Sequence, residues 1–314
     1  MVYSYFPDLE DRFVMDTDLD ALITALYVKV DDLLIEHPEA RPWRPRVGIA
    51  PVTSDAEMIT LAVLAQLLGF TDERRWVRWL KTHLTSWFPH TPKQSGYNKR
   101  QRQLAWTLSW ITDQIARSTT QWLDDIWLVD STPIEAARSH ETVQRSDMAG
   151  HGSYGYCASY SRWFWGFRLH LVATLGGLPI RWAVTPANAG ERETLLDMLE
   201  DGLDLAGHTI IADKGYAGKD LEAVLRGVGI KMLRPAKKNE PPRPGQALFK
   251  PFRQVIESIN ATLKTHLDIE HHMAHTIQGL FARTAAAILA LTAVIWHNEN
   301  TGQPIARSLI AYDH

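Results

Sequence analysis

DIWLVDS, residues 125–131, separates two kinds of sequence in this chain. It is a short apolar run, typical of a buried strand, and it ends on an acid, Asp130. Before it, apolar residues recur at helical spacing, and after it short apolar runs alternate with helical segments. We therefore predict an all-helical N-terminal domain over residues 1–120 and an α/β domain over residues 121–314.

The composition is that of an ordinary soluble globular protein. The chain has 314 residues, of which 45% are hydrophobic and 22% charged, which suggests about two domains. A single cysteine, Cys157, cannot form an internal disulfide and favours a reducing compartment. No secretory signal opens the chain, and the longest apolar run, residues 285–296, is too short to span a bilayer and indicates a buried helix. We therefore predict a cytoplasmic protein with no membrane partner.

Capping signals and apolar spacing predict several helices before residue 120. Residues 17–36 have the pattern of an amphipathic helix, and Ser54 with Glu57 forms a capping box at the start of the next one. Residues 71–89 and then residues 97–120 continue the helical pattern. These segments make up the predicted N-terminal domain.

The net charge of −3 conceals an asymmetry along the chain. Residues 1–40 carry ten acids against two bases, whereas residues 74–102 carry eight bases and no acid. Residues 231–264 hold eight bases against two acids. Two basic patches on an otherwise acidic chain predict a polyanionic partner, although a solvated surface explains either patch alone.

The second half alternates strands and helices. Gly176 and Gly177 join two apolar runs and predict a β-hairpin. The other elements that we expect are helices over residues 191–203, 219–229 and 252–264 and strands over residues 208–216 and 230–235. This order predicts an α/β domain, in contrast to a helical bundle or a β-sandwich.

Three acids in this domain are candidates for catalysis. Asp130 and Asp213 each follow a predicted buried strand, at the sheet edge where α/β proteins bind ligands. Glu257, on the last polar helix, can reach the same place. Carboxylates suit Mg²⁺ or Mn²⁺, and two such ions about 4 Å apart can promote phosphodiester cleavage. Alone, each acid is explained by a cap or an ion pair, and Glu257 by an i,i+4 pair with Arg253.

These acids lie in recognisable sequence blocks. LVDSTPIE surrounds Asp130, IIADKGY surrounds Asp213, and Arg253, Glu257 and Lys264 follow the spacing Arg-x3-Glu-x6-Lys. With these blocks in this order, the chain resembles bacterial insertion-sequence transposases of the DDE type. The resemblance extends over most of the chain.

The resemblance implies both a fold and an activity. It implies an RNase H-like mixed sheet flanked by helices, with Asp130, Asp213 and Glu257 as a catalytic triad that binds Mg²⁺ or Mn²⁺, as two ions. Enzymes of this family hydrolyse DNA at the terminal inverted repeats of their element to free 3′-hydroxyls, which then attack target DNA. The implied partners are double-stranded DNA and further copies of the chain, as a homodimer or larger assembly, and the DNA-bound protein would be associated with the nucleoid.

Basic side chains in the two patches and beside the acids are predicted to contact DNA phosphates. They are Arg74, Arg75, Arg78, Lys99, Arg100, Arg102, Arg138, Lys214, Lys237, Lys238, Arg253 and Lys264. Two other functions remain open at this point: a metal-dependent nuclease that does not transfer strands, and a catalytically inactive DNA-binding repressor. Metal-dependent nicking would separate an enzyme from a repressor, and joining of a cut end would separate a transposase from a nuclease.

Two further patterns need an interpretation. Residues 153–167 are dense in aromatic side chains that could stack on unpaired bases, although Phe164, Trp165 and Phe167 are predicted to pack on the sheet. His271 and His275 have the i,i+4 spacing of a zinc-binding helix. The glutamate of that motif is missing, because position 272 is His, so we predict a surface cluster of His271, His272 and His275 instead.

Overall fold

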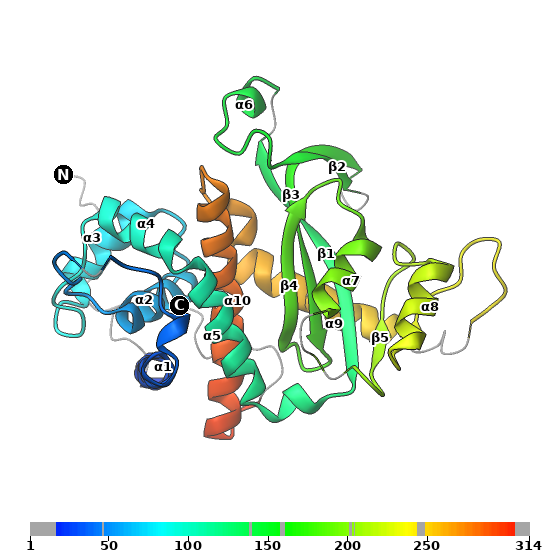
Figure 1. Cartoon of the computed structure of the whole chain (residues 1–314), viewed down its shortest axis with the longest axis horizontal. Helices are drawn as coiled ribbons and strands as arrows, with labels where there is room; N and C mark the ends of the chain where they lie inside the picture. Colours follow the sequence, from blue (N-terminus) through cyan, green and yellow to red (C-terminus); the bar gives the residue numbers. More distant parts are fainter. Residues whose placement is uncertain are drawn as a thin grey trace, which may run out of the picture.

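The computed structural model describes most of the chain. It covers residues 17–304 except for 46, 138–139, 158–160, 201–202, 204 and 244–248. Within these residues, a mixed sheet with helices on both faces lies beside a group of helices from the N-terminal part, and one long C-terminal helix lies between them (Figure 1).

The N-terminal helices follow the capping signals of the sequence. They are α1 (Thr17–Glu36), α2 (Asp55–Leu67), α3 (Glu73–His83), α4 (Gln94–Gln103) and α5 (Ala105–Arg117). The predicted capping box is present, because the Ser54 hydroxyl accepts from the Glu57 N–H at 3.0 Å and the Ser54 N–H donates to the Glu57 carboxylate at 2.5 Å. These two bonds satisfy backbone donors that the helix start leaves free.

The segment predicted as one helix over residues 97–120 is instead two helices. The chain turns at Leu104, which is buried, and its N–H bonds to the carbonyls of Arg100 and Arg102. The turn lets α4 bury Tyr97, whose hydroxyl accepts from the Trp76 indole at 3.0 Å. The apolar residues of α4 and those of α5 pack in different directions, so the segment forms two helices although its sequence has a continuous helical pattern.

The sheet has the RNase H-like arrangement. Its strands are β1 (Ile126–Ala137), β2 (Ser153–Cys157), β3 (Arg162–Thr174), β4 (Pro179–Pro186), β5 (Thr209–Ile211) and β6 (Lys231–Leu233). They are arranged in the order β2-β3-β1-β5-β6, with β4 also paired to β3. β3 runs antiparallel to both of its neighbours β1 and β4. β5 runs parallel to β1, and β6 runs parallel to β5. The predicted hairpin joins β3 to β4, and Gly177 at its turn has φ of +96°, which favours glycine.

β1 is longer than the sequence predicted. The expected strand ended near Asp130, but β1 continues to Ala137 because β3 pairs with it along this whole length. Phe164, Trp165 and Phe167 on β3 are buried as predicted. The polar stretch before β3, to which no element was assigned, contains the short helix α6 (His140–Gln144) and β2.

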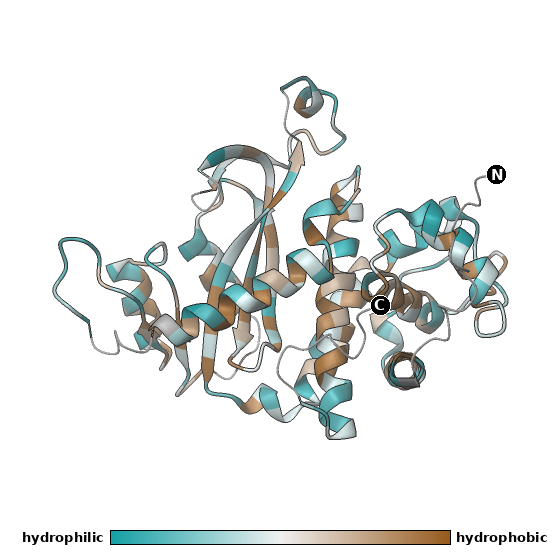
Figure 2. Ribbon diagram, turned by 180° about the vertical axis from the view of Figure 1, so that it is seen from behind, coloured by the Kyte–Doolittle hydropathy of each residue, from teal (hydrophilic) through white to brown (hydrophobic). Residues whose placement is uncertain are grey.

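Helices cover both faces of the sheet. α7 (Glu191–Leu199) and α9 (Phe249–Ala261) lie on opposite faces (Figures 1 and 2). α8 (Lys219–Gly227) lies beside β5 and β6 and is followed by β6 after a short turn. After α9 the chain continues through a π-helical turn over residues 262–266. α9 lies behind the sheet in the view of Figure 1 and contacts β1.

The C-terminal helix α10 (Ile277–Thr301) connects the two parts. It packs on α2 and α5 as well as on β4, and its central turns are apolar (Figure 2). By length and hydropathy it could cross a membrane, but 83% of its most apolar window is buried inside the fold. The predicted buried helix over residues 285–296 is confirmed. Buried residues from before and after residue 120 share one hydrophobic core. The division into domains over residues 1–120 and 121–314 therefore stays a prediction.

Candidate active site

The parallel register of β1 and β5 brings two acids to one place. The last pair in this register is Leu128 with Ile211. Asp130 and Asp213 each lie two residues beyond that pair, where β5 has ended and β1 continues. Because side chains alternate along a strand, Asp130 projects from the same face as Leu128. Asp213 follows a strand end as predicted, whereas Asp130 lies in the interior of β1.

Asp130 is held in a partly buried position. Its Oδ2 accepts a hydrogen bond from the Asn260 amide of α9 at 2.8 Å. Burial raises the pKa of Asp130 to about 6; the nearby charges of Asp213 and Glu191 raise it too, while the Ser131 N–H and Asn260 lower it. At neutral pH this carboxylate is therefore charged but costly to keep charged, a state that a cation would stabilise.

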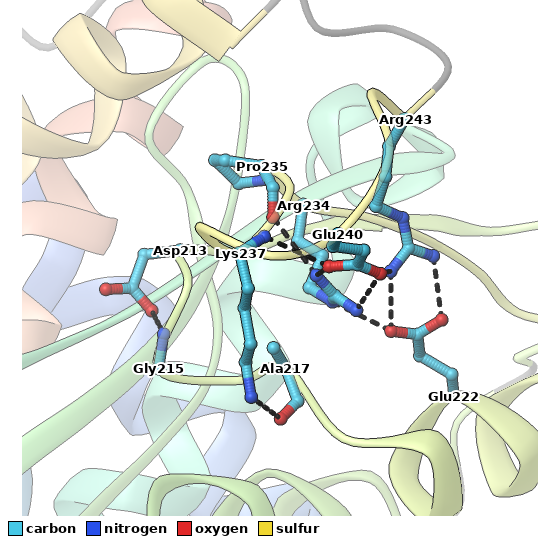
Figure 3. A network of polar contacts seen from close by, with 9 residues as sticks. All are labelled: Asp213, Gly215, Ala217, Glu222, Arg234, Pro235, Lys237, Glu240 and Arg243. Carbon is cyan, nitrogen blue, oxygen red and sulfur yellow. Dashed lines mark hydrogen bonds and ion pairs between the residues drawn. The ribbon is translucent and has the colours of Figure 1, made fainter.

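Asp213 lies in an exposed turn that closes on itself. Its Oδ1 accepts from the Gly215 N–H at 2.7 Å (Figure 3), as aspartates do in tight turns. A Cβ at Gly215 would lie 2.3 Å from Glu191 Oε2 and 3.0 Å from Asp213 Oδ1. Glycine at this position leaves a space that carboxylate oxygens from two different elements border.

Glu191, at the first position of α7, was missed by the sequence reasoning. Its Oε1 accepts from the Ser131 hydroxyl at 2.6 Å and lies 3.4 Å from Arg168 Nη1. Arg168 also donates to the Ser131 hydroxyl at 2.9 Å. The only available signal was an acid at the start of a helix that follows a strand, and that signal is common at helix N-termini.

Glu257 is on α9, the helix that contacts Asp130. Its Oε1 accepts from Arg253 Nε at 2.7 Å, and both side chains are exposed, Glu257 to 58%. This is the i,i+4 ion pair that the sequence left open as an alternative. Glu257 precedes Asn260 by three residues, so the two lie on one side of α9. The metal-binding role of Glu257 stays a prediction.

The donor chemistry around Asp130 suits a hard cation. Asp130, Asp213 and Glu191 offer carboxylate oxygens. Because residue 215 is glycine, no side chain at that position crowds the oxygens of Glu191 and Asp213. Tyr216 is fully buried, and within the described part of the chain its hydroxyl has no hydrogen-bond partner. Burial and these three charges raise its pKa. Among the residues that the structure describes, no three metal-ligating side chains are yet close enough to hold an ion together.

The histidine cluster differs from its prediction. His272 is buried and its Nδ1 accepts from the Ala274 N–H at 3.0 Å, so it is not a surface residue. Burial lowers its pKa to about 4. His271 and His275 are exposed, but the chain there is a short 3-10 turn and a loop instead of an α-helix. They border a groove of about 730 Å³ at the far end of β1, away from Asp130.

The predicted DNA-contacting bases fall into different environments. Those that are exposed are Arg74, Arg75, Arg78, Lys99, Arg102, Lys214, Lys237, Lys238 and Arg253. Arg100 is turned inward, where it bonds Asp55 at 2.7 Å and the carbonyls of Thr53 and Ser54. Lys264 pairs with Glu270 at 3.0 Å, and Arg138 lies outside the described residues.

A network of four charged residues fixes the loop after β6 (Figure 3). Arg234, only 6% exposed, donates to Glu222 of α8 and to both oxygens of Glu240 at 2.7 to 2.9 Å. Arg243 also donates to Glu222 at 2.7 Å and to Glu240 at 3.2 Å. Bonds from Arg243 and Arg234 lower the pKa of Glu222 to about 2. The loop is thus tied to α8 by charge-assisted hydrogen bonds.

This network sets the position of Lys237. The Lys237 N–H donates to Glu240 at 3.0 Å, and its ammonium donates to the Ala217 carbonyl at 3.2 Å. Ala217 belongs to the turn that carries Asp213 (Figure 3). Lys237 therefore lies beside the candidate site even though 24 positions separate it from Asp213 in the sequence.

The comparisons with known proteins identify the family of this chain. Residues 120–277, half of the chain, match the family described as Transposase DDE domain. The chain therefore belongs to the transposase DDE domain family, whose members are metal-dependent enzymes of DNA transposition that generally use Mg²⁺ or Mn²⁺.

Two other comparisons complete these findings. No curated protein sequence matches the chain. Among solved structures, the chain is similar to the piggyBac transposase in a synaptic complex with hairpin DNA, at 10% identity and a TM-score of 0.43, over 99% of this chain and 82% of that one. The family assignment rests on the Transposase DDE domain match.

Proposed function

We propose that this transposase binds the terminal inverted repeats of an insertion sequence, cleaves DNA there and joins the freed 3′ ends to target DNA. The observation that carries the proposal is the placement of Asp130 and Asp213, each two residues beyond the last parallel pair of β1 and β5. Two acids brought to one sheet edge from separate strands suit in-line displacement at phosphorus.

Asp130, Asp213 and Glu257 would hold the metal in this proposal, as two ions. The pair between Glu257 and Arg253 is exposed, and such pairs contribute little to stability, so Glu257 can leave Arg253 for the site at small cost. Bound there, Mg²⁺ or Mn²⁺ would favour deprotonation of the attacking group and neutralise the leaving oxygen.

The chain's own residues orient the two displacements. In the first, water attacks a phosphodiester phosphorus, and the bond to the 3′ oxygen breaks to leave a 3′-hydroxyl. In the second, that hydroxyl attacks a target phosphodiester and displaces the target's own 3′ oxygen. Asn260 fixes the direction of the Asp130 carboxylate by its hydrogen bond at 2.8 Å.

Exposed bases on both sides of the site would hold the DNA. Lys214 and Lys237 adjoin the Asp213 turn, and Arg253 would bind phosphate once Glu257 releases it. Bases on α3 and α4 would hold DNA farther from the cut, which supports a DNA-binding role for residues 1–120. Arg100 is left out of this set because its donors are used inside the fold.

Exposed aromatic side chains can add stacking contacts. Tyr156 and Trp163 are exposed on neighbouring strands, with ring centroids 5.5 Å apart. They offer a surface for unpaired bases near a cut end. An assembly of at least two copies in the DNA complex follows from the need to bring two transposon ends together, and a cytoplasmic, nucleoid-associated location follows from the substrate.

The proposal is tested by incubating the full chain with Mg²⁺ and labelled DNA that carries the ends of its own element, together with unlabelled plasmid. Nicking at the element end followed by transfer of label to the plasmid is the expected result. Nicking without transfer would identify a nuclease instead. Binding with no nicking in Mg²⁺ or Mn²⁺ would identify a DNA-binding repressor.

A further inference from the structure

The acids that approach Asp130 and Asp213 in the folded chain include one outside the DDE pattern. Glu191 lies 61 residues after Asp130 and 22 before Asp213 in the sequence, and it comes from the start of α7 on one face of the sheet. One of its carboxylate oxygens reaches the residue after Asp130, and the other reaches the residue two positions after Asp213. Oε1 accepts from Ser131, and Oε2 lies against Gly215.

The surroundings of Gly215 show how close the carboxylates of Glu191 and Asp213 lie to each other. A single Cβ there would touch both Glu191 Oε2, at 2.3 Å, and Asp213 Oδ1, at 3.0 Å. The two oxygens are therefore no farther apart than the sum of these distances. Two carboxylate oxygens this close repel each other unless a proton or a cation lies between or beside them.

The start of α7 does not account for the direction of Glu191. Acids stabilise helix N-termini, but the carboxylate that lies against the N-cap residue Gly190 belongs to Glu193. Glu191 turns away from its own helix toward β1 and the Asp213 turn. Its side chain is accordingly placed for the site instead of for the helix.

A buried hydroxyl independently marks a missing ligand at the same point. Tyr216 is completely buried, and its hydroxyl has no hydrogen-bond partner in the part of the chain that the structure describes. Unsatisfied buried hydroxyls are rare, because each costs about 1–3 kcal/mol. The acidic charges near this hydroxyl are those of Glu191, Asp130 and Asp213, and Arg168 is the basic one. A bound ion with its water would supply the missing partner.

We propose that Glu191 is a fourth acidic ligand of the metal site, beside Asp130, Asp213 and Glu257. The inference rests on the proposed function, since it assigns a further residue to the same site. Its second oxygen, Oε1, stays on Ser131 and Arg168, which fix the direction of the carboxylate as outer partners do for metal ligands. The ion that suits this set is Mg²⁺ or Mn²⁺.

The test is calorimetric titration of Mn²⁺ into the metal-free full chain, without DNA. Glu191→Gln keeps an oxygen that can accept from Ser131 but removes the charge, and we expect it to weaken Mn²⁺ binding by at least about tenfold. Glu193→Gln, the same change two residues on, should bind as wild type does. Asp213→Asn serves as the reference for loss of a ligand.

The outcomes separate this inference from the proposed function. If Asp213→Asn loses Mn²⁺ while Glu191→Gln binds as tightly as wild type, Glu191 is only a positioning residue and the inference is overturned alone. If the wild-type chain binds no Mn²⁺ at all, the proposed metal site fails and the inference fails with it.

A second measurement needs no substitution. Fe²⁺ bound in place of the native ion, with ascorbate and peroxide, cuts the polypeptide backbone beside its ligands. Cuts at 190–192 together with cuts near 130 and 213 are the expected pattern. Cuts near 130 and 213 without any at 190–192 would overturn the role of Glu191 even if Glu191→Gln failed to fold.

Discussion

Asp130 and Glu257 belong to the same predicted triad but are held in opposite ways. Asp130 lies inside β1, paired with Leu171 of β3 and just beyond the end of β5, and the Asn260 amide fixes its carboxylate. Glu257 lies on α9, where its side chain is 58% exposed and is paired with Arg253. The fold determines the position of Asp130, whereas a helix face and a local ion pair determine that of Glu257.

The difference shows which part of the site exists before metal and DNA arrive. Sheet register fixes Asp130 at a cost, since burial raises its pKa to about 6. Glu257 has no such cost, because exposed pairs contribute about 0–1 kcal/mol. We infer a site with a rigid half on the sheet and a recruited half on α9. The predictions below test this division.

The largest expected effect on the recruited half comes from Glu257→Gln. We expect end cleavage to fall by about 10³-fold, or ~4 kcal/mol, because a metal-binding charge is lost. Stability in urea should change by less than about 1 kcal/mol, because the pair with Arg253 is exposed. Arg253→Gln breaks the same pair but leaves the acid. Because Arg253 is also proposed to bind phosphate, both variants are compared at saturating DNA. If the cleavage of Arg253→Gln there falls as far as that of Glu257→Gln, the pair itself matters and recruitment is wrong.

On the rigid half, Gly215→Ala should be the next most harmful change. The added Cβ would meet Glu191 Oε2 at 2.3 Å and Asp213 Oδ1 at 3.0 Å. Displacing these oxygens by about 1 Å should reduce cleavage by about 10²-fold, measured on end DNA with Mg²⁺. Gly227→Ala is the control, since nothing lies within 4 Å of a Cβ there. Equal cleavage by both variants would contradict the close approach of the two acids.

The loop that carries Lys237 depends on a buried arginine. Arg234→Met should lower the free energy of unfolding by about 2–3 kcal/mol, because Glu240 loses its main partner and Glu222 loses one of its two arginine partners. Lys238→Met, on the exposed side of the same loop, is the control and should have little effect. Urea unfolding measures both variants, and equal stability would show that the network in Figure 3 does not hold the loop.

The same network predicts a dependence on pH. The pKa of Glu222 is lowered to about 2, chiefly by Arg243 and then Arg234. A lowered carboxyl pKa gives stability that is present above the ordinary value near 4.5 and is lost as the pH falls toward about 2. The stability difference between wild type and Arg234→Met should therefore shrink over this range, and a constant difference would contradict the linkage.

Asp130→Asn removes a proposed metal ligand, but in the absence of metal it should increase stability, a change of opposite sign to that of Arg234→Met. The folded pKa of Asp130, about 6, is above the ordinary 3.8, so the folded state binds this proton more tightly than the unfolded chain. Its contribution is therefore complete below about pH 4 and is lost as the pH rises through 6. In EDTA, Asp130→Asn should gain about 1–3 kcal/mol on wild type between pH 4 and 7. A stability difference that does not depend on pH would mean that folding does not raise the pKa of Asp130.

Local signals predicted the fold better than the site. The Ser54 capping box, the Gly176-Gly177 hairpin and the buried helix over residues 285–296 each depend on neighbouring residues, and all three are present. The sequence predicted that the first strand ends at Asp130. The strand continues because it pairs with β3, and the local sequence gives no sign of that pairing.

Long-range contacts explain what the sequence could not predict at the site. Glu191 lies at the Asp213 turn because α7 packs on the sheet there. Lys237 lies at the same turn because an ion-pair network holds its loop. Arg100 looked like its exposed neighbours in a basic run, but its contact with Asp55, 45 positions earlier, turns it inward. Such pairings follow from tertiary packing and leave no local pattern.

The most direct test of the central claim compares two aspartates seven positions apart. Asp213→Asn removes a charge at the sheet edge, while Asp220→Asn makes the same change on exposed α8. Both variants are incubated with labelled transposon-end DNA and Mg²⁺, with binding measured in parallel. The account predicts that Asp213→Asn binds but does not nick, while Asp220→Asn nicks as wild type does. Nicking by Asp213→Asn at the wild-type rate would contradict it.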